Sequence, residues 1–160
     1  MLMLKKICKK LDEWLLEENK ARYEDGTVLF KKVEIKIVGQ AALIEAKIQL
    51  SLLATMDVDA YMNCEFEVRK KFDDLLQEED KHLDPNSKLV WMPEETEYQN
   101  FYLGKMLKVY LAKAEYILLS KALKAPDKNK DLIVEYLAKG ASPLFQKLAV
   151  KYKLDLDKFL

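Results

Sequence analysis

The stretch KKVEIKIVGQAAL, residues 31–43, decides the fold, because its hydrophobic period changes in the middle. Val33, Ile35 and Ile37 alternate with polar residues, and side chains that alternate in this way share one face of a β-strand. The residues that follow Gly39 favour a helix. We therefore expect a half-buried strand that ends at Gly39, where the chain turns into a helix.

The segments on both sides of this stretch continue the alternation of helices and strands. Residues 3–20 carry apolar side chains at helical spacing. After residue 39 we expect helices at 40–50 and 65–82, strands at 52–62, 87–93 and 106–112, a less regular strand within 94–105, and final helices at 114–124, 127–139 and 142–153. This order predicts an α/β (α+β) fold, in which helices flank a small mixed sheet and a helical tail follows it.

Length and charge limit the classes of protein to which the chain can belong. The 160 residues fit one domain, which we divide into an N-terminal helix at 1–22, a sheet core at 33–112 and a helical tail at 114–160. The 27 Lys and Arg residues balance the 27 Asp and Glu residues. A neutral chain has no strongly basic field, so the composition does not imply tight nonspecific binding of nucleic acid.

The cysteines, the histidine and the hydropathy indicate a protein of the cytoplasm. Cys8 and Cys64 lie far apart and have no histidine neighbour, so they do not form a zinc site. We expect structural or surface roles for them and for His82, in a reducing compartment. No window approaches the ~20 apolar residues of a membrane span, and no signal peptide is recognisable. We therefore expect no membrane partner.

Two aspartates lie in the strand expected at 52–62, within ATMDVDAY. Residues i and i+2 of a strand point to the same face, so Asp57 and Asp59 project together. Two close carboxylates repel each other, and a cation between them relieves the repulsion. Mg²⁺ binds carboxylate oxygens and keeps positions for phosphate, so the pair predicts a metal site for phosphoryl or nucleotidyl transfer. The solvated face of an edge strand is the alternative interpretation.

Gly39 precedes Asp57 by eighteen residues, so one helix fits between them. A glycine between a strand and a helix lets phosphate approach the backbone, where the first turn of the helix has free N–H groups. We expect this turn and the two aspartates to line the same end of the sheet.

In this order, the motifs resemble those of the nucleotidyltransferase-fold superfamily, the minimal enzymes related to polymerase beta. The bacterial families that include abortive-infection-type toxins, with many uncharacterised proteins, are the most similar. Their pattern of an apolar strand, a glycine turn, a helix and an Asp-x-Asp strand corresponds to IKIVGQAAL and ATMDVDAY. Their later lysine and basic-Asp pair correspond to YILLSKALKAPDKNKDLIVEYL. The likeness spans residues 33–138.

The resemblance implies a role for each matching residue. Asp57 and Asp59 would be the catalytic residues and would bind Mg²⁺ together with a nucleoside triphosphate. The implied nucleotide-binding residues are Gly39, Gln40, Thr55, Lys121, Lys130 and Asp131.

The family also supplies a third carboxylate from a later strand. The segment expected as that strand, KLVWMP, has Val90, Trp91 and Met92 at the matching positions. Glu94 and Glu95 follow it and are the candidates to replace the missing acid. We therefore expect an incomplete acidic triad.

Two functions remain open at this point. The first is Mg²⁺-dependent transfer of a nucleotidyl group from a nucleoside triphosphate to a hydroxyl acceptor, with nucleic acid involved only as that acceptor. The alternative is a catalytically degraded binding protein with a protein partner, such as a member of a toxin–antitoxin or defence pair. Trp14 and Leu15 of the N-terminal helix offer a docking face for such a partner.

Overall fold

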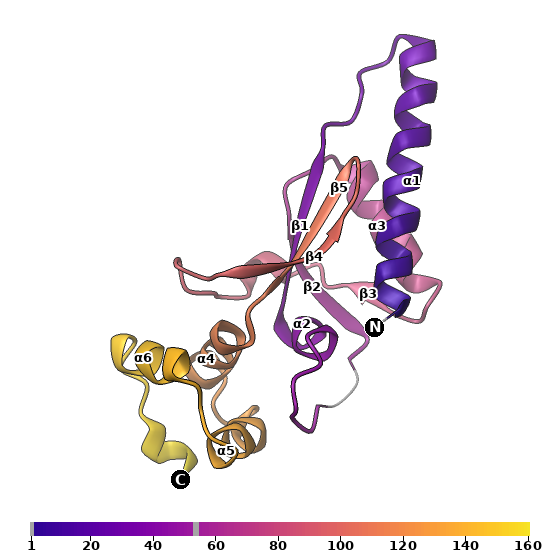
Figure 1. Cartoon of the computed structure of the whole chain (residues 1–160). Coiled ribbons are helices and arrows are strands. Elements are labelled where there is room, and N and C mark those ends of the chain that lie inside the picture. The colour runs from indigo at the N-terminus through magenta and orange to yellow at the C-terminus, as the bar shows by residue number, and fades with distance from the viewer. Residues whose placement is uncertain (1, 53–54) are drawn as a thin grey trace.

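The computed structural model describes residues 2–52 and 55–160 of the chain (Figure 1). Within these residues, six α-helices accompany one five-stranded mixed sheet. The α/β (α+β) class expected from the sequence is therefore confirmed.

The sheet has the strand order β3-β2-β1-β5-β4. Its strands are β1 (Val33–Val38), β2 (Asp57–Met62), β3 (His82–Leu83), β4 (Tyr98–Leu103) and β5 (Leu107–Ala112). Strand β1 runs parallel to β5 and antiparallel to β2, and the short β3 runs parallel to β2. The carboxyl ends of β1 and β5 and the start of β2 therefore meet at one end of the sheet.

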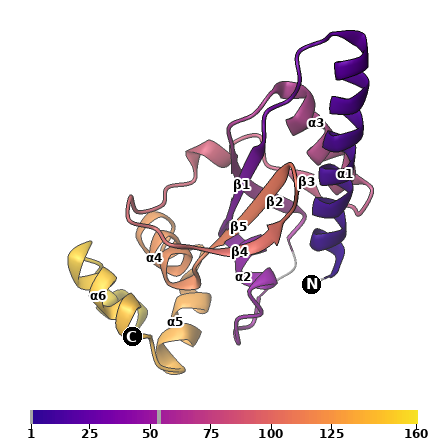
Figure 2. The same ribbon diagram turned by 45° about the horizontal axis from the view of Figure 1, so that its top comes forward.

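The helices divide into two groups around this sheet. They are α1 (Leu2–Asp25), α2 (Gly39–Glu45), α3 (Phe66–Gln77), α4 (Ala114–Lys124), α5 (Lys130–Ala138) and α6 (Pro143–Lys151). Helices α1 and α3 lie along one side of the sheet, and α4, α5 and α6 gather beyond the end at which α2 begins (Figures 1 and 2). The side chains of Val33, Ile35 and Ile37 are buried, as their alternation predicts.

A buried carboxylate attaches the β4–β5 hairpin to α1. Asp12 accepts hydrogen bonds from the Tyr102 hydroxyl at 3.0 Å and from the backbone N–H groups of Met106 and Leu107 at 2.8 and 3.0 Å. A buried carboxylate is tolerated when several donors satisfy it. Asp12 therefore fixes the position of β5 against the helix.

Several element boundaries differ from the sequence prediction. The helix expected at 40–50 ends at Glu45, the helix expected at 65–82 ends at Gln77, and the helix expected at 127–139 begins at Lys130. The strand expected at 52–62 begins at Asp57, and its residues 53 and 54 lie outside the described ranges.

The prediction of a strand at 87–93 was wrong. Residues Ser87–Leu89 form a 3-10 turn, and the structure, which describes all of 55–160, has no strand between this turn and β4. The N–H of Ala60 in β2 donates to the Ser87 hydroxyl at 3.1 Å. A side chain thus satisfies the edge of β2 where a strand would have paired, and Pro93 lacks the N–H that a ladder requires.

None of the helices in ranges 2–52 and 55–160 combines the length and the apolar character needed to cross a bilayer.

Candidate functional site

A cavity of about 650 Å³ opens where β2 begins, between α2, α4 and α5. Its lining combines carboxylates with lysines. The charged side chains that line it are Asp57, Asp59, Asp84, Lys121, Lys128 and Asp131. Asp59, Lys121 and Lys128 also line an adjoining cavity of about 470 Å³, together with Gly39.

Asp84 brings a third carboxylate to the aspartate pair. Strand β3 pairs with β2 in the register Asp57↔His82 and Val58↔Leu83. The N–H of Asp84 donates to the Val58 carbonyl at 2.9 Å, which extends this pairing by one residue. Asp84 therefore lies beside Asp59 on the neighbouring strand.

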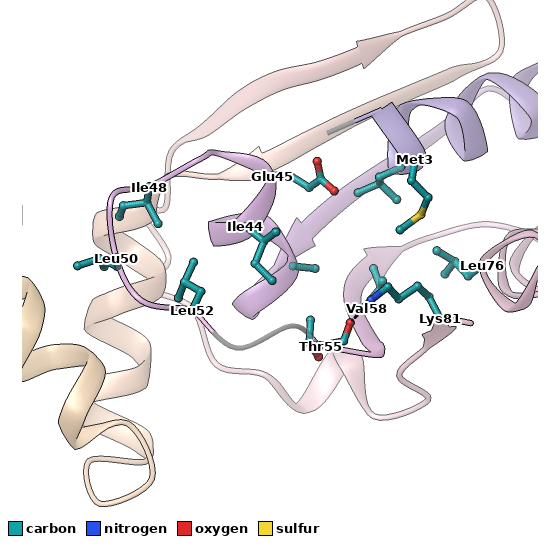
Figure 3. A pocket seen from close by; sticks show the side chains of 12 residues that line it. Met3, Ile44, Glu45, Ile48, Leu50, Leu52, Thr55, Val58, Leu76 and Lys81 are labelled. Carbon is teal, nitrogen blue, oxygen red and sulfur yellow. Dashed lines mark hydrogen bonds between the residues drawn. The ribbon is translucent and has the colours of Figure 1, made fainter. Parts of the chain in front are cut away.

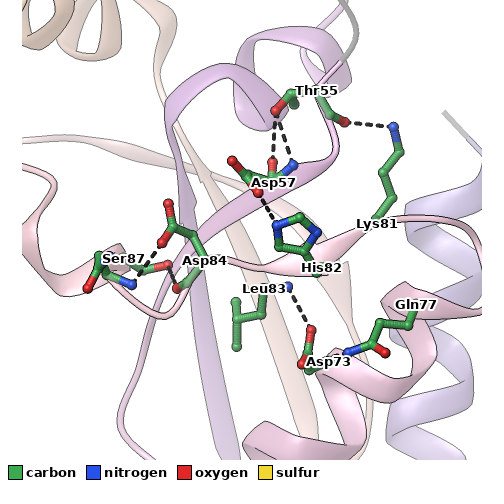
Figure 4. A network of polar contacts seen from close by, with 10 residues as sticks. Thr55, Asp57, Asp73, Gln77, Lys81, His82, Leu83, Asp84 and Ser87 are labelled. Carbon is green, nitrogen blue, oxygen red and sulfur yellow. Dashed lines mark hydrogen bonds and ion pairs between the residues drawn. The ribbon is translucent and has the colours of Figure 1, made fainter.

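A tight turn holds Asp84 in this position (Figure 4). Its carboxylate Oδ1 accepts a hydrogen bond from the Asn86 N–H at 2.8 Å. Its carbonyl accepts from the Ser87 hydroxyl at 2.7 Å, and the same hydroxyl accepts from Ala60 in β2. The turn is therefore anchored to the strand that carries Asp59.

The electrostatic environment of Asp59 is unusual. Its pKa rises from the ordinary value of 3.8 to about 6, first because burial penalises the charged form. The charge of Asp84, a hydrogen bond shared with Asp84 and the charge of Asp57 raise the pKa further, while Lys121 lowers it. The Oδ1 atom of Asp59 is buried and has no hydrogen-bond partner among the described residues. The site therefore holds more negative charge than its own residues neutralise.

Gly39 makes room for the Asp59 carboxylate. It has a φ of +73°, a conformation that favours glycine. A Cβ atom at this position would lie 2.7 Å from Oδ2 of Asp59. The sequence predicted a glycine that faces phosphate, and the structure places it directly against a carboxylate.

Asp57 contacts His82, a pairing that the sequence analysis did not predict. Its carboxylate Oδ1 forms an ion pair with His82 Nε2 (Figure 4). The N–H of Asp57 donates to the Thr55 hydroxyl at 3.2 Å, and Lys81 donates to the Thr55 carbonyl at 2.7 Å. Thr55 thus supports the start of β2, and His82 is at the rim of the site.

The lysines of the helical tail are only partly those that the sequence indicated. Lys121 lines the cavity, and its pKa is lowered by burial and by the charge of Lys128, while Asp59 raises it. Gln40 and Asp131 also line the cavity, whereas Lys130 does not. Lys130 and Asp131 open α5 as expected, and it is Lys128, in the turn before this helix, that lines the cavity.

The two glutamates considered as the third acid lie elsewhere. Glu95 accepts hydrogen bonds from Lys151 and Tyr152, which lower its pKa to about 2. Glu94 is exposed, and neither glutamate lines the cavity. The sequence analysis looked for the third acid on the strand expected at residues 87–93. It did not consider Asp84, which precedes that segment.

The carboxylates that line the cavity are suitable ligands for a hard divalent cation. Their side chains are not already arranged around one. In the described part of the chain, no three His, Cys, Asp or Glu side chains are positioned as a metal site. Carboxylate oxygens are the ligands that Mg²⁺ prefers. The unpartnered Oδ1 of Asp59 and the raised pKa of this residue show where a cation would relieve repulsion.

A further cavity of about 470 Å³ lies between the start of α1, α2 and the end of α3 (Figure 3). Its lining is mainly apolar, with side chains such as Ile44, Ile48 and Leu50. Its lysine, Lys81, is already bonded to the Thr55 carbonyl. The chemistry of the chain therefore concentrates in the acidic cavity.

No family model, no curated protein and no solved structure matches this chain. Its function is therefore argued from the geometry of the site.

The raised pKa of Asp59 predicts a stability that depends on pH. The folded state holds the proton of Asp59 more tightly than the unfolded state, and this tighter binding stabilises the fold. The stabilisation is complete below about pH 4 and is lost as the pH rises through 6. We expect Asp59→Asn to stabilise the fold at pH 8 by about 1 kcal/mol, a value reduced for solvent screening of this partly exposed group. Near pH 4 the gain should vanish. Urea unfolding at both pH values measures it.

The matched control for this experiment is Asp127→Asn, because Asp127 lines neither charged cavity. A stability change for Asp59→Asn that is the same at both pH values would contradict the electrostatic explanation.

Sequence reasoning missed Asp84, His82 and Lys128. The signal for Asp84 was the short string HLDPN, in which a leucine and an aspartate precede a proline. The strand in this string has two residues, too few for an alternating pattern, so the sequence placed His82 at the end of a helix.

Proposed function

We propose that the chain binds a nucleoside triphosphate with Mg²⁺ and transfers its nucleotidyl group to a hydroxyl acceptor, with pyrophosphate as the leaving group. The observation that carries the proposal is that carboxylates and lysines line the same cavity. Asp59 and Asp84 lie side by side and share a hydrogen bond, and Lys121 lines the same cavity. Carboxylates that bind a cation, next to lysines that bind phosphate, match a metal-bound triphosphate.

Each residue has a separate task in this proposal. Asp57 and Asp59 would hold the cation, whose positive charge would offset that of the phosphates. Lys121 and Lys128 bind phosphate oxygens as point charges. Asp84, beside Asp59, accepts the proton of the attacking hydroxyl.

A calorimetric titration tests the binding step. We expect a nucleoside triphosphate to bind in the presence of Mg²⁺ and to bind at least about tenfold more weakly with EDTA. Asp57→Asn should abolish the effect of Mg²⁺, because it removes a charged metal ligand. Asp127→Asn, a change outside the cavity, should bind like the unchanged chain. Equal binding with and without Mg²⁺ would refute the proposal.

One observation favours the alternative of a binding protein without catalysis. Asp57 pairs with His82, and this pair competes with a metal for the Asp57 carboxylate. A chain that binds the nucleotide with Mg²⁺ and transfers nothing to any hydroxyl would be this second type. His82→Ala should then increase the affinity for Mg²⁺ in the same titration.

A further inference from the structure

A row of aromatic and cationic side chains crosses the sheet on the face that carries Asp59. The register pairs Lys36 of β1 with Tyr61 of β2 on one side and with Tyr110 of β5 on the other. Tyr110 in turn pairs with Asn100 of β4. Neighbouring strands lie about 4.8 Å apart, so Lys36 separates two tyrosines by about 10 Å.

This face of the sheet remains partly accessible to solvent. Lys36, Tyr61 and Tyr110 are partly exposed, whereas their strand neighbours Ile35 and Val109, which point the other way, are fully buried. Helices α1 and α3 lie along the opposite side of the sheet (Figures 1 and 2). The helical layer therefore covers one face and leaves the tyrosines on the other.

The charge of this face differs from the charge of the whole chain. Among the described residues, four cations and one carboxylate line a cavity of about 500 Å³ above β1 and β2, namely Lys32, Lys36, Arg69, Lys88 and Glu34. The complete sequence has a formal net charge of +0. The excess of positive charge is therefore local, and it attracts a negatively charged partner to this face.

Contacts with neighbouring residues orient two tyrosines of this face, Tyr61 and Tyr98. The Tyr61 hydroxyl donates a hydrogen bond to the Val90 carbonyl. Lys36 Nζ lies 5.0 Å from the ring centre of Tyr98, which belongs to the same face. Flat rings interleaved with lysines match bases and phosphates together, since bases stack on rings and lysines contact the backbone. An acidic protein surface would use the lysines and leave the rings without partners.

We propose that the face formed by Lys32, Lys36, Tyr61, Lys88 and Tyr110 binds single-stranded nucleic acid. Asp59 precedes Tyr61 by two residues and points to the same face, about 7 Å along the strand. A nucleic-acid strand bound on this face would therefore extend toward the acidic cavity. Its role as the hydroxyl acceptor rests on the function proposed above, and its binding does not.

The test measures binding without metal or nucleotide. Fluorescence anisotropy in EDTA follows labelled oligouridylate and oligothymidylate of about 12 nucleotides. We expect binding that weakens between about 50 and 200 mM salt, with a slope of about −2 to −3 in log K against log salt. A duplex of the same length should bind at least about tenfold more weakly, because its bases cannot stack on the rings.

Variants separate the two parts of the surface. Lys32→Glu with Lys88→Glu should weaken binding at least about tenfold. The matched control, Lys9→Glu with Lys20→Glu, makes the same charge change on exposed positions of α1 and should not. Tyr110→Phe should bind like the unchanged chain, and Tyr110→Ala should lose about tenfold in affinity. Circular dichroism confirms that each variant is folded.

Three results would overturn the proposal. They are no binding of either oligonucleotide, equal binding of single strand and duplex, and competition by polyglutamate as strong as by an unlabelled oligonucleotide. Because EDTA removes divalent cations, the oligonucleotide assay does not depend on the Mg²⁺ site that the nucleotide titration tests. If the chain binds the oligonucleotide but fails the nucleotide titration, the nucleic-acid-binding surface stands and the proposed transferase function is refuted.

Discussion

Asp84→Asn is expected to reduce nucleotidyl transfer by about two to four orders of magnitude, the range for loss of a general base. The asparagine of this variant keeps an oxygen that accepts from the Asn86 N–H, so the turn that positions it should persist. The carboxylate that accepts the proton in the proposed reaction is lost. Transfer of a labelled nucleotide to a hydroxyl acceptor, with the unchanged chain beside it, measures the effect.

The control for this experiment is Glu95→Gln, since Glu95 is bonded to Lys151 and Tyr152 away from the cavity. We expect transfer to be unchanged in that variant. Asp84→Asn should also lower the pKa of Asp59, because the charge of Asp84 and its hydrogen bond both raise it. The pH dependence of Mg²⁺ binding should therefore move to lower pH, a shift that a purely structural role would not cause. Loss of transfer in Glu95→Gln with full transfer in Asp84→Asn would reverse the assignment.

Gly39→Ala is expected to have a large effect on stability, a loss of about 3 kcal/mol or more. The positive φ of +73° costs an L-residue about 1–2 kcal/mol. The added Cβ would also lie 2.7 Å from Asp59 Oδ2, so the strand or the carboxylate must move. Urea unfolding measures the loss, and Mg²⁺ binding should fall with it because Asp59 is displaced.

Gly26 provides a matched control for the two costs. Its φ is +70°, and a Cβ there would meet nothing within 4 Å. Gly26→Ala therefore carries the backbone cost without the collision, and the difference between the variants isolates the contact with Asp59. In an Asp59→Ala background, Gly39→Ala should lose less stability. Equal losses for Gly26→Ala and Gly39→Ala would contradict the close approach.

The sequence was informative wherever one element is long enough to show its own period. The alternation from Val33 to Ile37 predicted β1, and the glycine at the end of it predicted the turn into α2. The i, i+2 spacing of Asp57 and Asp59 placed both on one strand, and the structure has them in β2. These predictions need no partner element, because strand and helix periods are properties of neighbouring residues.

The prediction failed where a position depends on a distant segment. The apolar string KLVWMP favoured a strand, yet the Ser87 hydroxyl and the short β3 satisfy the edge of β2. The sequence also could not show that Lys128, in the turn before α5, lines the cavity and that Lys130 does not.

The sequence by itself determined the class of the fold, the turn at Gly39 and the pair Asp57 and Asp59. Only the tertiary structure decided that Asp84 lies beside Asp59 and that tyrosines and lysines share a face that α1 and α3 do not cover. The physical reason is the range of the interactions. Periodicity and turn conformation arise between residues a few positions apart, whereas strand pairing and the packing of helices on one face join residues far apart in the chain.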